Sequence, residues 1–135
     1  MRIIATLSLA ALAAGCAVSD APTEMSAAAQ NKLTEELRGF SAGPAQSCVS
    51  RRDLRGNRSV GDDVIIFEGR SRNLVYVNRP NGGCPSLNSG RALITRTPGP
   101  QLCSGDIATV FDPVSRAEFG GCGLADFQPY RRVKG

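Results

Sequence analysis

The sequence predicts a mainly β protein, with a small antiparallel sheet or open barrel of five to six short strands, two disulfides and one short preceding helix. Three observations support this class. Short runs rich in β-branched and aromatic residues recur about every ten residues after residue 48. Glycine, proline, asparagine and aspartate separate these runs, as turns between antiparallel strands require. Four cysteines are spread over the same region, which is typical of a small domain in an oxidising compartment.

One helix is predicted before the β region, over residues 26–39. Ser26 is a suitable N-cap, good helix formers follow it, and Gly39 is a natural stop. An apolar stripe runs along this helix, formed by Met25, Ala29, Leu33, Leu37 and Phe40. We expect the stripe to pack on the domain's own core. Contact with a partner protein or a lipid surface is the alternative, and the mixed charge of the polar face disfavours lipid.

The strands are predicted from apolar runs bounded by turn residues. They are residues 48–58, 64–68, 74–78, 91–96, 106–111 and 117–122. The second and third are the clearest, and the loop 69–73 between them predicts a β-hairpin. Arginine density and Gly56 weaken the pattern of the first. Residues 41–47 are expected to be a linker, and the basic segment 130–134 a frayed terminus.

The cysteines Cys48, Cys84, Cys103 and Cys122 allow three disulfide pairings, and their spacing does not choose among them. We prefer the nested pairing, Cys48–Cys122 with Cys84–Cys103, because it ties the two ends of the domain together. The sequential pairing, Cys48–Cys84 with Cys103–Cys122, is the main alternative. A four-thiolate zinc site is disfavoured, because the chain has no closely spaced cysteine pair and no histidine.

The N-terminus has the layout of an export signal. Arg2 precedes an apolar run over residues 3–14, and small residues lead to Cys16. The run is shorter than the roughly twenty residues that a membrane-spanning helix needs. The segment resembles a bacterial lipoprotein signal, which implies cleavage before Cys16 and acylation, including palmitate, on that cysteine. An ordinary signal peptide is the alternative.

This resemblance divides the chain into four parts. Residues 1–15 are the expected signal peptide, 16–25 a lipidated tether, 26–47 the helix and linker, and 48–135 the disulfide-bonded β domain. The residue after Cys16 is Ala17 rather than aspartate. By analogy with lipoproteins of Gram-negative bacteria, this predicts anchoring in the outer membrane, facing the periplasm.

The β region carries five short motifs in order. They are Cys48-Val49, Val75-Tyr76-Val77-Asn78-Arg79, Cys84-Pro85-Ser86-Leu87, Leu102-Cys103-Ser104-Gly105-Asp106 and Cys122-Gly123-Leu124, with Phe127 after the last. Together they resemble a family of small exported proteobacterial proteins that is classed only as a domain of unknown function. The resemblance implies a fold and a location but supplies no activity and no functional residues.

The composition restricts the chemistry that the chain can perform. Without histidine there is no Ser-His-Asp or Cys-His nucleophile and no histidine-ligated metal. Asp62, Asp63 and Glu68 could act as paired carboxylates of a hydrolase, but a turn followed by an exposed strand position explains them better. Asp106 is expected to cap a tight turn. We predict no catalytic residue, no metal site and no cofactor.

The densest basic cluster consists of Arg51, Arg52, Arg55 and Arg58. It could bind an anion, such as a lipid A phosphate, a peptidoglycan carboxylate or an acidic protein. The alternative, a charged edge strand that prevents aggregation, is favoured. On a regular strand Arg51 and Arg55 would share one face, and Arg52 and Arg58 the other.

These observations predict a non-enzymatic, periplasm-facing lipoprotein that binds an envelope protein or another envelope component. A carboxylate-based cell-wall hydrolase and a purely structural envelope protein are the alternatives. Its partners would be the membrane, reached through acyl chains on Cys16, and the bound component. No nucleic-acid partner is expected, because aromatic residues are sparse and the net charge is only +4.

Overall fold

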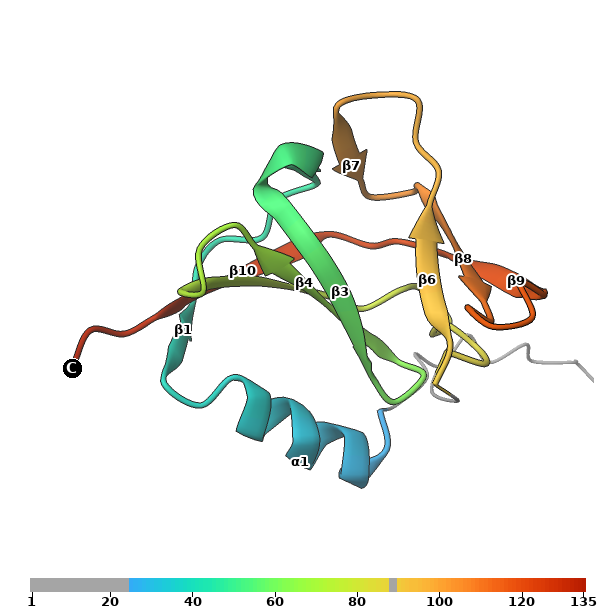
Figure 1. Ribbon diagram of the computed structural model, residues 1–135. Helices are drawn as coiled ribbons and strands as arrows, with labels where there is room; N and C mark the ends of the chain where they lie inside the picture. Colours follow the sequence, from blue (N-terminus) through green and yellow to red (C-terminus); the bar gives the residue numbers. More distant parts are fainter. Residues whose placement is uncertain (1–24, 88–89) are drawn as a thin grey trace, which may run out of the picture.

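The computed structural model describes residues 25–87 and 90–135 as three layers (Figure 1). Helix α1 (Ala27–Glu36) covers one face of a five-stranded sheet, and two smaller sheets cover the other face. The strands are β1 (Phe40–Ala42), β2 (Cys48–Ser50), β3 (Leu54–Val60), β4 (Val64–Gly69), β5 (Leu74–Asn78), β6 (Ala92–Thr95), β7 (Gln101–Cys103), β8 (Ile107–Phe111), β9 (Glu118–Gly123) and β10 (Phe127–Arg132). A single 3₁₀ turn, η1 (Arg51–Asp53), joins β2 to β3.

All strand pairs are antiparallel. The large sheet has the order β1-β10-β5-β4-β3, and the small sheets are β2-β7 and β6-β8-β9. This confirms the predicted class: a mainly β fold with antiparallel sheets, one short helix and two disulfides, in which the described strands form no closed barrel. The described strands number ten rather than five to six, because the sequence pattern did not predict β1, β7 and β10, and the predicted strand 48–58 is divided into β2 and β3.

Helix α1 confirms the prediction that its apolar stripe packs on the domain's own core. Ser26 is the N-cap, and its Oγ accepts a hydrogen bond from the backbone N–H of Ala29 at 3.2 Å. All five stripe residues belong to one cluster with the side chains of Val60, Val64, Ile66, Val75 and Val77. The helix therefore buries its apolar side against the sheet and leaves its polar side in solvent.

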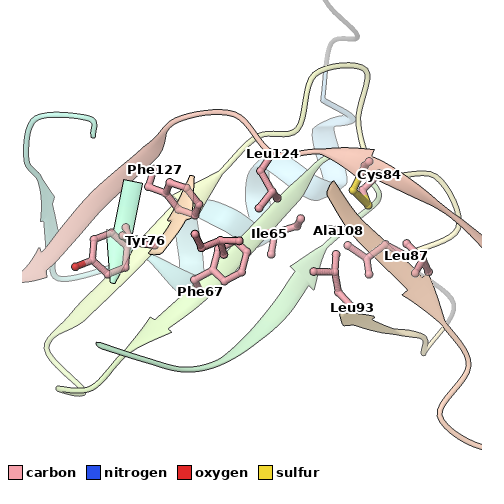
Figure 2. Packing of buried hydrophobic residues seen from close by; sticks show 13 residues of the cluster. Ile65, Phe67, Tyr76, Cys84, Leu87, Leu93, Ala108, Leu124 and Phe127 are labelled. Carbon is pink, nitrogen blue, oxygen red and sulfur yellow. A yellow bond between two sulfur atoms is a disulfide. The ribbon is translucent and has the colours of Figure 1, made fainter. Parts of the chain in front are cut away.

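The central strands β4 and β5 are buried on both faces of the sheet, which explains their almost continuous apolar sequences. Alternate residues of β4 point to opposite layers. Ile66 faces α1, whereas Ile65 and Phe67 face the small sheets and pack with Tyr76 and Phe127 (Figure 2). The rings of Phe67 and Phe127 lie 5.5 Å apart between centroids. Both layers thus depend on one central hairpin.

The C-terminal segment is a strand of the large sheet and not a frayed terminus. Strand β10 lies between β1 and β5, and β1 occupies part of the expected linker 41–47. Pro129 made this strand hard to predict, because proline cannot donate a ladder hydrogen bond. The structure places Pro129 just beyond the end of β1, where its carbonyl accepts from the N–H of Gly43 at 2.8 Å. The missing N–H therefore interrupts little of the ladder.

The disulfides are Cys48–Cys103 and Cys84–Cys122, so the preferred pairing, Cys48–Cys122 with Cys84–Cys103, is wrong. Cys48 and Cys103 are directly opposite each other on β2 and β7, with 4.0 Å between their Cα atoms. Cys122 on β9 points into the core, where it meets Cys84 from the loop after β5. The ends of the domain are joined instead by the pairing of β1 with β10.

Asp112 caps the turn between β8 and β9 and gives a pH prediction. The backbone N–H groups of Ser115 and Val114 donate to its Oδ1 at 2.9 and 2.7 Å, and they lower the pKa of this carboxyl from its ordinary value. Because this pKa is lower in the folded state, the ionised carboxyl stabilises the fold at pH values above its unfolded-state pKa. This contribution is lost as the pH falls through the folded-state pKa. We expect carbon-13 NMR titration to show a midpoint below the ordinary aspartate value of about 3.9, and Asp112→Asn should remove this titration from the spectrum. A midpoint at or above this value would contradict the capping role.

Candidate functional site

The structure divides the predicted arginine cluster into two pairs. Arg51 and Arg52 lie in η1, where Arg51 donates from Nη1 to the carbonyl of Gly99 at 3.4 Å. Arg55 and Arg58 lie on β3 and line the same cavity, although a regular strand would place them on opposite faces. The reason is an irregularity in the β3–β4 ladder between Leu54 and Gly56. This extra residue re-aims the strand, as a β-bulge does.

The cavity lies on the helix-covered face of the large sheet, next to the end of α1 and close to the β4–β5 hairpin. We call it the arginine groove. Its volume is about 270 Å³. Its side chains are cationic, acidic and apolar: Arg55, Arg58, Arg72 and Arg132; Glu36 and Glu68; and Phe40, Leu74 and Val75. Four arginines and two glutamates give this lining a net side-chain charge of +2.

Arg58 forms an ion pair with each of the two acidic side chains of the groove. Its Nη2 lies 2.8 Å from Glu36 Oε2, and its Nη1 lies 2.6 Å from Glu68 Oε1. These pairs join the end of α1 to β3 and β4. Because all three side chains are about one-third exposed, we expect the pairs mainly to orient the groups, with little contribution to stability.

The other three guanidinium groups keep donors available for a ligand. Arg55 uses Nε to donate to the carbonyl of Gly69 at 3.1 Å. Arg132 stacks on the ring of Phe40, with its Cζ 4.6 Å from the ring centroid. Within the described ranges no carboxylate pairs with Arg55, Arg72 or Arg132. The groove therefore combines unpaired cations with an apolar wall, which suits an anionic group attached to an apolar or aromatic body.

Of the carboxylates considered for hydrolysis, Glu68 is not brought together with Asp62 and Asp63. Asp62 and Asp63 lie in the turn between β3 and β4, whereas Glu68 lies five residues along β4 and is paired with Arg58. Five residues of strand separate such groups by roughly 16 Å. That is beyond the spacing of either class of glycosidase, which reaches about 9.5 Å. Asp106 has its expected capping role, since its Oδ2 accepts from the N–H of Cys103 at 2.8 Å.

The sequence did not predict that Glu36, Phe40, Arg72 or Arg132 belongs to a candidate site. Arg72 lies in the β4–β5 loop, Arg132 ends β10, and Phe40 begins β1. The basic character of the C-terminal segment was visible in the sequence. Its position beside Phe40 was not, because that depends on the β1–β10 pairing.

A scan of protein-family models and searches of curated proteins and solved structures found no match to this chain. No helix in the described part of the chain is long and apolar enough to cross a membrane. Cys16, the expected lipidation site, lies outside the described residues.

Proposed function

We propose that the protein is a non-enzymatic, periplasm-facing lipoprotein whose arginine groove binds an anionic group of an envelope component. The observation that carries this proposal is the grouping of Arg55, Arg72 and Arg132 without acidic partners in the described structure. Planar guanidinium groups recognise phosphate and carboxylate through paired hydrogen bonds. Lipid A phosphates and peptidoglycan carboxylates both offer this chemistry.

Burial and stacking favour a bound ligand over a merely charged surface. Phe40, Leu74 and Val75 bring apolar surface to the same cavity, so part of a ligand can leave water while its anion stays hydrogen-bonded. The stacking of Arg132 on Phe40 fixes one guanidinium before a ligand arrives. A preorganised donor costs less entropy on binding.

The charge-reversal variant Arg72→Glu/Arg132→Glu is expected to weaken binding by at least about tenfold, because attraction becomes repulsion at the anion. Binding would be measured with purified protein carrying Cys16→Ser, so that acyl chains do not contribute. The probes are phosphatidylcholine vesicles with and without lipopolysaccharide, and soluble muropeptides. Preferential binding to the vesicles that contain lipopolysaccharide would identify phosphate as the bound group. Preferential binding to muropeptides would identify carboxylate.

The matched control is Arg51→Glu/Arg52→Glu, which changes the net charge equally but lies outside the groove. We expect it to retain binding within about twofold at physiological salt, where distant charges are screened. If both variants weaken binding equally, the loss of affinity comes from the change in net charge and not from the groove. Failure of the unmodified groove to bind either probe would refute the proposed ligand.

Membrane attachment is tested separately through Cys16. Cys16→Ser removes the thiol that would carry an acyl chain, so we expect the protein to leave the membrane fraction after cell fractionation. Cys48→Ser/Cys103→Ser is the control, because those thiols form a disulfide within the folded domain. Membrane retention of the Cys16→Ser protein would show that the anchor lies elsewhere.

A further inference from the structure

A second cavity opens between the large sheet and the small sheets. Its volume is about 150 Å³. Its floor is apolar and its rim polar: Leu54, Phe67 and Leu102 below, with Arg51, Asn57 and Thr95 around the opening. Phe67 and Leu102 belong to the main core, so the cavity leads from solvent to buried apolar surface. We call it the inter-sheet cavity.

Two unpaired strand edges border this cavity. Among the described strands, β3 is the last strand of the large sheet and β6 is the last strand of its own sheet. Asn57 of β3 and Thr95 of β6 both line the opening, and Figure 1 shows β3 and β6 as strands of two different sheets. An edge strand presents N–H and C=O groups that can pair with another chain. β3 is seven residues long, and the N–H and C=O groups of alternate residues point to this free edge.

We propose that β3 accepts an extended segment of an envelope protein as an added strand, and that this segment places one apolar side chain in the inter-sheet cavity. Backbone hydrogen bonds to β3 would supply affinity, and the cavity would select the side chain. A cavity of about 150 Å³ with an apolar floor can hold a benzene-sized group. A leucine, valine or phenylalanine side chain therefore suits it.

The charge around the opening indicates an acidic segment. Arg51 lines the cavity and Arg52 follows it in η1. No carboxylate pairs with either arginine in the described residues, and Arg51 makes one long bond to the carbonyl of Gly99. Acidic residues flanking the apolar anchor would complement these cations.

The same charges argue against a second copy of this chain as the occupant. β3 carries Arg55, and η1 directly before it carries Arg51 and Arg52; none of these three arginines pairs with a carboxylate among the described residues. Two β3 strands paired edge to edge would concentrate these like charges along one interface, which destabilises strand pairing. The only carboxylate in this stretch is that of Asp53.

The test uses the synthetic peptide acetyl-Asp-Leu-Asp-Leu-Asp-Leu-Asp-amide and a matched peptide with lysine in place of aspartate. Nitrogen-15 NMR titration of the folded protein locates each peptide. We expect the acidic peptide to shift the amide signals of β3 and of Thr95, and to bind at least about tenfold more tightly than the lysine peptide. Shifts confined to other surfaces, or equal binding of both peptides, would overturn the proposal.

Two variants separate the contributions of charge and cavity. Arg51→Glu/Arg52→Glu should weaken the acidic peptide by about tenfold, whereas Arg72→Glu/Arg132→Glu in the arginine groove should leave it unchanged. Thr95→Phe should fill the opening and abolish binding while the other amide signals keep their positions. If Arg72→Glu/Arg132→Glu weakens binding of the acidic peptide and Arg51→Glu/Arg52→Glu does not, the peptide binds in the arginine groove. That result would overturn the proposal that it binds to β3.

Two further outcomes would show that the β3 edge is occupied by this protein itself and not by another protein. A dimer detected by analytical ultracentrifugation, with its contact at β3, would identify a second copy. A shift of β3 signals on reversing the charges of Asp20 and Glu24 would identify the chain's own N-terminal segment. Either result would overturn the proposal of an envelope partner.

Discussion

Cys84→Ala/Cys122→Ala is expected to destabilise the protein by about 4 kcal/mol, the chain-entropy contribution of a crosslink that spans 38 residues. Small domains have a total free energy of unfolding of about 5–15 kcal/mol. One lost crosslink therefore removes a large share of the stability, and reduction of both disulfides is expected to unfold the domain.

The two disulfides should differ in importance, although their loop lengths do not predict it. Cys48–Cys103 spans 55 residues, and the same relation again gives about 4 kcal/mol. The difference lies in burial. Cys84 and Cys122 are 0% and 6% exposed and belong to the main core, whereas Cys48 and Cys103 are half-buried at β2 and β7. Replacing the buried pair by alanine also leaves a void, so it should cost more.

Urea denaturation of the two double-alanine variants, followed by circular dichroism, checks this ranking. The expected order of midpoints is wild type, then Cys48→Ala/Cys103→Ala, then Cys84→Ala/Cys122→Ala. Wild type in excess dithiothreitol provides the fully reduced reference. A reduced protein with an unchanged midpoint would show that neither crosslink supports the fold, and a reversed order would contradict the argument from burial.

The sequence predicted the elements whose local pattern and tertiary burial agree. β4 and β5 are apolar throughout because both of their faces are covered, and α1 shows a single stripe because one face is. β10 fails this test, since it carries Pro129 and ends in two arginines. Its place beside β5 is set by long-range pairing, which local pattern does not contain.

The same distinction applies to the candidate site. Arg55 and Arg58 were singled out from the sequence as members of a dense cluster. Their common orientation follows from the irregularity in strand pairing between Leu54 and Gly56. No residue in this segment predicts that irregularity from the sequence. Arg72 and Arg132 lie beside them only because the β4–β5 loop and the C-terminal end of β10 line the same cavity. The disulfide pairing is non-local in the same way, since cysteine spacing leaves all three pairings open.

Asn78→Ala is expected to destabilise the protein by about 3 kcal/mol, because it leaves buried backbone groups without partners. Asn78 is fully buried at the end of β5. Its Nδ2 donates to the carbonyls of Ala125 and Asp126 at 2.6 and 3.4 Å, and its Oδ1 accepts from the N–H of Ala125 at 3.1 Å. These bonds hold the turn that leads into β10. Chemical denaturation at neutral pH measures the loss.

Asn78→Asp separates the hydrogen bonds from the volume of the side chain. An ionised carboxylate has the shape of the amide but cannot donate to the two carbonyls, and burial disfavours its charge. Burial therefore raises the pKa of the introduced carboxyl in the folded state. The destabilisation should be smallest at acidic pH, where the carboxyl is neutral and can donate one hydrogen bond. It should grow as the pH rises through about 3.9, the value in the unfolded chain. Asn57→Asp, at an exposed position of β3, is the matched control and should show no such growth. If both variants have the same pH profile, Asn78 fills space without fixing the turn, and β10 must be held in place by the pairing of its own backbone.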